Sequence, residues 1–308
     1  MNKIEPILQE NKDRFVLFPI KHKEIWDIYK KIESNFWMIK DVCFDDDVKL
    51  IGELPKEETE FIKLVSVLLQ DRFNKDFDKR FSCFLTYVQY PEARCMLGFQ
   101  TMMFNVHAEV YSAYFNDFAK GYDLNVLNVD ALVQKEKWLD ANFNSQTDFS
   151  KKLIVYTATQ RILYSSVFAG ISKHIYRKDL FSPMILKFIY DDEAIFTDFA
   201  LTLFFQLENK ISVDEIYTIL KEATEIEIKI IESFSSYYEK IGIDKDTIIK
   251  FSQYNANLIY NCICGELIYD VKKNPVPKLN WDRSYVKLDL YKSKYQVNSK
   301  ILTLTEEF

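Results

Sequence analysis

The stretch of sequence that decides the fold is VQYPEARCMLGFQTMMFNVHAEVYSAYFNDFAK, residues 88–120. After Pro91 it contains no further proline, and Gly98 is its only glycine. Its apolar residues recur at intervals of three and four, which is the spacing of residues on one face of an α-helix. The stretch therefore predicts one long helix with a wide apolar face that is buried against other helices.

The same pattern extends along most of the chain. Residues 92–182 and 184–274 contain no proline and almost no glycine, which suits long helices better than sheets with turns. Ser182-Pro183 and the Ser212–Glu215 pair have the spacing of helix starts, and Gly242 has the character of a helix end. Apolar residues with a period near 3.6 predict helices at 57–85, 88–120, 127–142, 150–177, 184–208, 213–241 and 245–271.

These segments predict an all-α protein built as one helical bundle around a central buried helix. No low-complexity tract or linker divides the bundle, which we place at residues 22–271. Residues 1–21 are expected to form an extended N-terminal arm, and residues 272–308 an extended C-terminal tail. His22, where the arm meets the bundle, is expected to open a helix at an exposed position.

Composition excludes several classes of function. The 6 glycines lie too far apart to form a phosphate-binding loop. A net charge of −6 argues against nucleic acid and against an anionic membrane surface as partners. No apolar run has the length of a membrane span, and the charged opening MNKIEPILQENKDR is unlike a signal peptide. Five scattered cysteines are typical of reduced thiols, so a cytoplasmic location is expected.

Three ionisable residues interrupt the apolar faces of different predicted helices: Asp71, His107 and Glu193. A buried charge is costly unless it is paired or bound to a metal, so the three together suggest a metal site or the remains of one. Taken singly, each residue is more typical of a core side chain held by hydrogen bonds, and both interpretations stay open at this point.

A complete di-metal site can be excluded from the sequence. Helical bundles that bind two metal ions through carboxylates use a Glu-x-x-His motif on each of two helices. The residues three positions before the histidines of this chain are Pro19, Phe104 and Ile171. No Glu-x-x-His motif is therefore present.

Six stretches in order along the chain resemble the small subunit of class I ribonucleotide reductase. They are RFVLFPI (14–20), NFW (35–37), VQYPEARCMLGFQ (88–100), HAEVYS (107–112), DDEAIFTDFA (191–200) and LTLTEEF (302–308). The resemblance implies a ferritin-like helical bundle that forms dimers. It also implies the family's activity, in which a di-iron centre and dioxygen generate a tyrosyl radical that is passed to a cysteine of the large subunit.

Matched position by position, the resemblance implies that half of the metal ligands are missing. Asp71, His107 and Glu193 match ligands of the family. The other three ligand positions hold residues that do not bind iron: Phe104, Gln160 and Phe196. No complete cofactor is expected, although binding of a single metal ion at the three remaining positions stays open.

The residues that carry the radical in the family have counterparts in this chain. Tyr111, four residues after His107, matches the radical tyrosine. Trp37, Asp192 and Tyr295 match the relay toward the large subunit. The resemblance thus implies a relay that is retained beside a metal site that is not.

This combination leaves three hypotheses. The preferred one is an auxiliary small subunit that assembles no di-iron radical centre of its own and pairs with an intact small subunit. The second is an active radical-carrying subunit with altered or metal-free chemistry. The third is a purely structural interaction protein on the same bundle. As a subunit of the reductase the chain is expected to take part in an oxidoreductase, and whether it is an enzyme alone stays open.

The C-terminal residues suggest a docking peptide. Apolar anchors beside acidic groups are typical of a segment that becomes ordered on a partner. The resemblance implies that this partner is the large subunit. The residues concerned are Leu302, Leu304, Glu306, Glu307 and Phe308. The other expected partner is a second small subunit, in a homodimer or a heterodimer.

Overall fold

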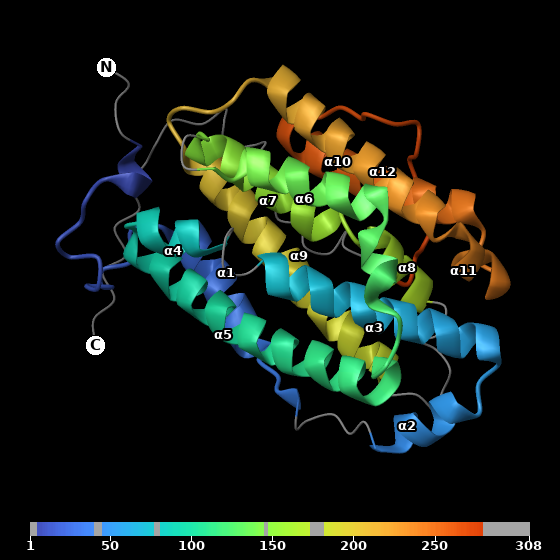
Figure 1. Cartoon of the computed structure of the whole chain (residues 1–308). Helices are drawn as coiled ribbons and strands as arrows, with labels where there is room; N and C mark the ends of the chain where they lie inside the picture. Colours follow the sequence, from blue (N-terminus) through green and yellow to red (C-terminus); the bar gives the residue numbers. More distant parts are fainter. Residues whose placement is uncertain (1–4, 40–44, 77–80, 145–146, 173–181, 280–308) are drawn as a thin grey trace.

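A computed structural model describes residues 5–39, 45–76, 81–144, 147–172 and 182–279 of the chain (Figure 1). All regular elements in these ranges are helices, which confirms the predicted all-α fold. The α-helices are α1 Lys23–Ser34, α2 Asp45–Gly52, α3 Lys56–Asp76, α4 Ser82–Tyr87, α5 Pro91–Tyr114, α6 Asp130–Asn142, α7 Phe149–Arg161, α8 Ser165–Ser172, α9 Ser182–Gln206, α10 Val213–Ser233, α11 Ser235–Lys240 and α12 Lys245–Cys264.

Helix α5 follows the prediction for residues 88–120. Pro91 starts the helix, Glu92 lies in its first turn, and a π-helical turn at Phe115–Ala119 prolongs it. Proline suits this first position because its missing N–H would have no partner inside the helix. The buried residues of α5 recur every three or four positions from Ala93 to Tyr114.

Helix ends agree with the local sequence at several points. Ser212 and Glu215 form a reciprocal capping box at the start of α10. Gly242, with a φ of 68°, follows α11, and its N–H donates to the carbonyl of Glu239. The prediction for 245–271 was too long, because Gly265 ends α12 in the left-handed conformation with a φ of 80°.

Other boundaries differ from the predictions. Helices α1 and α2 lie in a region where no helix range was assigned. The helix predicted at 213–241 is divided at Phe234, and the helix predicted at 150–177 is divided between Arg161 and Ser165. Apolar periodicity continues through both breaks because the residues on each side are buried in the same core. Periodicity reports burial, and it is less sensitive to a short interruption of the backbone.

The break between α7 and α8 has a polar centre. Tyr164 adopts a φ of 66°, which is uncommon for a residue with a side chain. The fully buried carboxylate of Glu227, on α10, accepts hydrogen bonds from the backbone N–H groups of Tyr164 and Ser166, each at 2.9 Å. Glu227 therefore satisfies backbone donors that the interrupted helix leaves without a partner.

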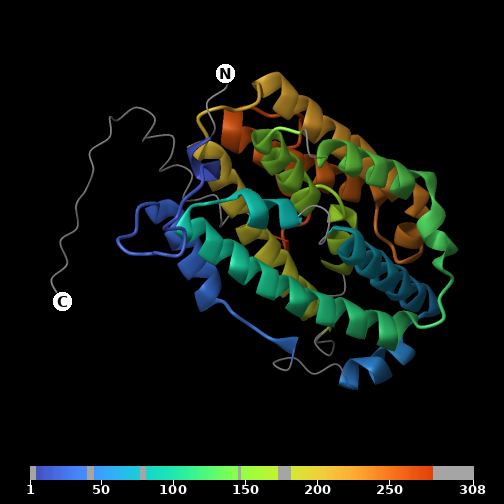
Figure 2. The same cartoon turned by 60° about the vertical axis from the view of Figure 1, so that its left-hand side comes forward.

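Helix α9 runs through the middle of the bundle, as Figures 1 and 2 show. It packs against α1, α5, α7 and α8. Helix α3 also packs on α5, and α10 packs on α6, α7 and α12. Side chains from α3, α5, α7 and α9 therefore meet inside the bundle. None of the helices in the described ranges combines the length and apolar character needed to cross a bilayer.

The N-terminal arm is attached to one end of the bundle. The backbone carbonyl of Ile7, a buried residue, accepts a hydrogen bond from the N–H of Gln89 at 2.8 Å. The carboxylate of Glu5 accepts hydrogen bonds from the N–H groups of Glu208 and Asn209. At the other end of the chain, Tyr295 and residues 302–308 lie outside the described ranges, so their predicted roles stay predictions.

Candidate functional site

Three residues that the sequence analysis singled out meet inside the bundle. Asp192 on α9 accepts a hydrogen bond from Trp37 Nε1 at 2.9 Å, and His107 Nε2 on α5 lies 2.9 Å from the same oxygen, Oδ2. All three side chains are buried, and the indole of Trp37 stacks on the imidazole of His107 with ring centroids 5.9 Å apart. One oxygen of Asp192 therefore joins the indole of Trp37 and the imidazole of His107.

Aromatic rings occupy the next layer of the site. Phe104 on α5 and Phe196 on α9 face each other with ring centroids 5.4 Å apart. Both rings also lie beside the imidazole of His107. The centroid of that imidazole is 6.2 Å from the centroid of Phe104 and 6.1 Å from that of Phe196. Phe196 is fully buried and Phe104 nearly so. Two of the positions at which the resemblance places metal ligands thus contribute hydrocarbon packing.

A buried ion pair occupies the side of the site toward α3. Arg72 Nη1 lies 2.9 Å from Glu193 Oε1, and both side chains are almost completely buried. The amide oxygen of Gln160, on α7, accepts a longer hydrogen bond from Arg72 Nη2 at 3.4 Å. One guanidinium therefore contacts both the glutamate and the glutamine at the predicted ligand positions.

Arg72 is held from its other side by Tyr164, the residue at the α7–α8 break. The guanidinium carbon lies 5.3 Å from the centroid of the Tyr164 ring, within the range of a cation–π interaction. The fully buried ammonium of Lys135 lies 4.2 Å from the same centroid and also contacts the Tyr164 hydroxyl. The position of Arg72 is therefore fixed by an ion pair and by an aromatic ring.

The electrostatics of Glu193 reflect this environment. Complete burial raises the pKa of the Glu193 carboxyl, because removal from water disfavours its charged form. The positive charge of Arg72 acts in the opposite direction, followed by the effects of His107 and Arg161. An ionised Glu193 thus depends on Arg72 as its partner within the bundle.

The structure places the remaining predicted residues as follows. Tyr111 is buried one turn after His107, with ring centroids 6.5 Å apart. Asp71 is only partly buried, and its neighbour Arg72 is the residue that reaches Glu193. In the part of the chain that the structure describes, no three His, Cys, Asp or Glu side chains are grouped so that they could hold a metal ion. Asp71, His107 and Glu193 therefore do not form a ligand cluster.

The chain matches the family model described as "Ribonucleotide reductase, small chain" over residues 14–275. It belongs to the ribonucleotide reductase small chain family. The ribonucleoside-diphosphate reductase small chain of Neurospora crassa is 30% identical over 281 residues, covering 86% of this chain and 67% of that protein. The corresponding protein of Plasmodium falciparum is 29% identical, covering 90% of this chain and 80% of the relative.

Solved structures agree with this assignment. The Rnr4 homodimer of Saccharomyces cerevisiae is similar with a TM-score of 0.78 and 28% identity, covering 87% of each chain. A dimanganese(II)-NrdF from Streptococcus sanguinis has a TM-score of 0.72 at 18% identity, covering 84% of this chain and 95% of that chain. The second comparison supports the fold alone. The ferritin-like bundle predicted from the motifs is thereby confirmed.

The residues of the centre do not fit a di-iron cofactor. Two bridged metal ions need several carboxylates and histidines. Here one oxygen of Glu193 is paired with Arg72, His107 Nε2 lies against Asp192, and no group of three possible ligands occurs among the described residues. A guanidinium beside the carboxylate repels a metal cation, and the rings of Phe104 and Phe196 offer no lone pairs. The cation that lies against Glu193 in this structure is the guanidinium of Arg72.

Sequence reasoning missed Arg72 and Tyr164. Asp71 and Arg72 both follow the apolar run LVSVLL, so the preceding turn does not distinguish them. The apolar residues of the earlier turns do distinguish them. Phe61, Val65 and Leu68 belong to the core and lie on the side of α3 that also carries Arg72. Tyr164 had no comparable signal, since its place depends on a backbone break that Glu227 stabilises from another helix.

Proposed function

We propose that this chain is an auxiliary small subunit of ribonucleoside-diphosphate reductase. It would support the holoenzyme without assembling a di-iron tyrosyl-radical centre of its own. The observation that carries this proposal is the Arg72–Glu193 ion pair, packed beside Phe104 and Phe196. A guanidinium neutralises the glutamate that iron would otherwise neutralise, so the bundle is complete without a metal.

The proposed assembly pairs this chain with a second small subunit that has a full ligand set. The similarity to Rnr4, described as a homodimer, supports small-subunit pairing in general, and a homodimer of this chain is the alternative. Family membership supports the large subunit as the second partner. In such a complex the intact subunit would supply the radical, and this chain would contribute shape and docking surface.

Loading with ferrous iron and dioxygen is the direct test. The full chain is expected to retain far less than two irons per polypeptide after removal of excess metal, and to give no tyrosyl signal by electron paramagnetic resonance. A small chain with all six ligands, treated in parallel, is the control for the loading procedure. Two bridged irons per chain together with a tyrosyl radical would overturn the proposal.

One observation favours a second candidate, an active subunit with metal-free radical chemistry. The hydrogen bonds that join Trp37, Asp192 and His107 are intact, and Tyr111 lies beside His107. Under this alternative, Tyr111 would be chemically modified in the mature protein. Intact-protein mass spectrometry distinguishes the two, because an added oxygen on Tyr111 with a stable radical supports the alternative and an unmodified chain supports the auxiliary function.

We propose that the C-terminal tail docks the large subunit, as the family resemblance implies. Deletion of residues 302–308 is expected to weaken large-subunit binding at least tenfold, because Leu302, Leu304 and Phe308 are its apolar anchors. Surface plasmon resonance against immobilised large subunit measures the change. The circular dichroism of the deleted chain is expected to stay unchanged. Binding that survives the deletion would place the contact on the bundle instead.

A further inference from the structure

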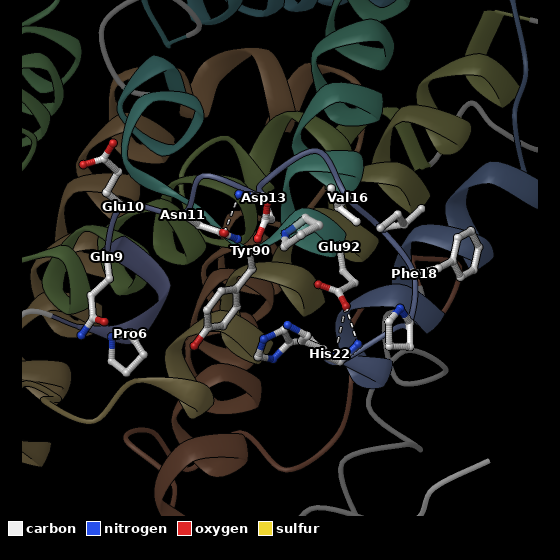
Figure 3. Close-up of a pocket in the computed structure, with 14 residues that line it drawn as sticks. Pro6, Gln9, Glu10, Asn11, Asp13, Val16, Phe18, His22, Tyr90 and Glu92 are labelled. Carbon is white, nitrogen blue, oxygen red and sulfur yellow. Dashed lines mark hydrogen bonds between the residues drawn. The ribbon is translucent and has the colours of Figure 1, made fainter. Parts of the chain in front are cut away.

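A cavity of about 570 Å³ lies between the N-terminal arm and the start of α5. Figure 3 shows the arm passing over it, with Tyr90, Glu92 and His22 around its interior. The volume falls in the range of pockets that bind small ligands or single side chains. This cavity is separate from the centre around His107 and Glu193, and the proposed function makes no use of it.

Glu92 is the residue that gives the cavity its chemistry. Its side chain is 1% exposed, and Oε1 accepts hydrogen bonds from the backbone N–H groups of Lys21 and His22 at 2.6 Å and 3.1 Å. The second oxygen, Oε2, is buried and accepts no hydrogen bond within the described residues. Glu92 lies in the first turn of α5, where the helix dipole interacts favourably with an acidic side chain. Oε2 therefore has the capacity to accept from a donor that enters the cavity.

The other lining residues favour a positively charged donor. Glu10 and Asp13 add two carboxylates, and Lys21 is the lining residue that bears a fixed positive charge. His22 was expected to be exposed, but it is partly buried and stacks on Tyr90 with ring centroids 3.8 Å apart. Burial lowers the pKa of His22, so its imidazole is neutral at pH 7.

Aromatic and apolar groups complete the cavity and its rim. Tyr90 lines the cavity with an aromatic ring, one face of which is stacked on His22. Val16 and Phe18 also line the cavity, yet they are 60% and 73% exposed, and neighbouring Phe15 is 75% exposed. The guanidinium groups of Arg14 and Arg94 lie over Phe15, which is outside the lining. Exposed apolar side chains grouped in this way are typical of a protein interaction site.

We propose that this cavity receives a lysine or arginine side chain from a partner protein, presented between apolar residues. The cation pairs with Glu92 Oε2, and its stem lies along Tyr90. The apolar residues beside it in the partner pack on Val16 and Phe18. The complementary negative charge of Glu10 and Asp13 orients the cation on approach.

The test uses short peptides and the full-length chain. The probes are acetyl-Leu-Arg-Leu-amide and the same peptide with citrulline, which keeps the shape of arginine without its charge. Isothermal titration calorimetry is expected to show at least tenfold tighter binding of the arginine peptide. Glu92→Gln is expected to reduce this ratio to less than twofold. The glutamine keeps Oε1 as the acceptor for Lys21 and His22, so the arm stays in place, which circular dichroism and the melting temperature verify.

Two further measurements keep the outcome decisive. A photo-leucine version of the arginine peptide is expected to crosslink the wild-type chain at the arm or the start of α5, as mapped by mass spectrometry. Equal binding of the two peptides, an unchanged ratio in Glu92→Gln, or crosslinks confined to other helices would overturn the proposal. Binding of 1,5-diaminopentane as tight as that of the arginine peptide would also overturn it, because the site would then recognise a free amine rather than a protein segment.

Discussion

Replacement of Arg72 by methionine is expected to lower the free energy of unfolding by about 3–5 kcal/mol, the range found when one partner of a buried ion pair is removed. Methionine keeps much of the length and packing of arginine, so the loss reports the charge. It leaves Glu193 buried without its counter-ion and removes one of the two cations that lie against the ring of Tyr164. Urea unfolding followed by circular dichroism at pH 7 measures the change.

A matched control is available on α9. Lys187 pairs with Asp191 near the surface, where the two side chains are 35% and 46% exposed. Lys187→Met is expected to change stability by less than about 1 kcal/mol. Glu193→Gln in the Arg72→Met background is expected to recover much of the loss, since the orphan charge is then removed. A loss of under 1 kcal/mol in Arg72→Met would mean that Glu193 is already neutral and the pair contributes little.

This result bears directly on the proposed function. If the guanidinium stabilises the bundle to this extent, the chain folds around an internal cation that pairs with Glu193. A metal ion and Arg72 would compete for the same carboxylate of Glu193, so Glu193 can pair with only one of them at a time. A subunit of this kind is independent of iron supply for its folding, which suits a partner that stabilises an assembly.

The sequence predicted more of the fold than of the site. Long proline-free stretches with one apolar face were sufficient for α5, α9, α10 and α12, because burial and helical period act together there. The loss of ligands at Phe104, Gln160 and Phe196 is implied by the resemblance and stays a prediction, since it depends on residue type alone. The ion pair of Arg72 with Glu193 could not be predicted, because it depends on which of two adjacent polar residues of α3 faces Glu193.

The break between α7 and α8 was missed for a related reason. Helix periodicity depends on which residues are buried. Every residue from Leu153 to Ile171 is buried, so burial does not mark the place where the helix is interrupted. The interruption is stabilised by the carboxylate of Glu227, which lies more than sixty residues later in the sequence. A contact of that kind joins a charged residue to backbone groups, so it leaves no trace in the side chains around the break.

Glu227→Ala is therefore expected to lower the free energy of unfolding by about 3–5 kcal/mol. The substitution leaves the N–H groups of Tyr164 and Ser166 buried without acceptors, at about 1–3 kcal/mol each, and it opens a cavity in the core. Without this support, the φ of 66° at Tyr164 loses its compensation, and the ring that holds Arg72 is expected to shift. Chemical denaturation measures the first effect, and a crystal structure of the variant measures the second.

Two variants on α10 separate the effect of the lost hydrogen bonds from the other effects of Glu227→Ala. Glu227→Gln keeps the volume and one acceptor, so a smaller loss of about 1–2 kcal/mol is expected. Glu222→Ala removes an exposed carboxylate that accepts from Trp138 Nε1, and a change within about 1 kcal/mol is expected. Equal losses in Glu227→Ala and Glu222→Ala would show that the α7–α8 break is stable without Glu227. The position of Tyr164 would then be set by packing alone. Arg72 would keep its contact with the Tyr164 ring without the hydrogen bonds of Glu227.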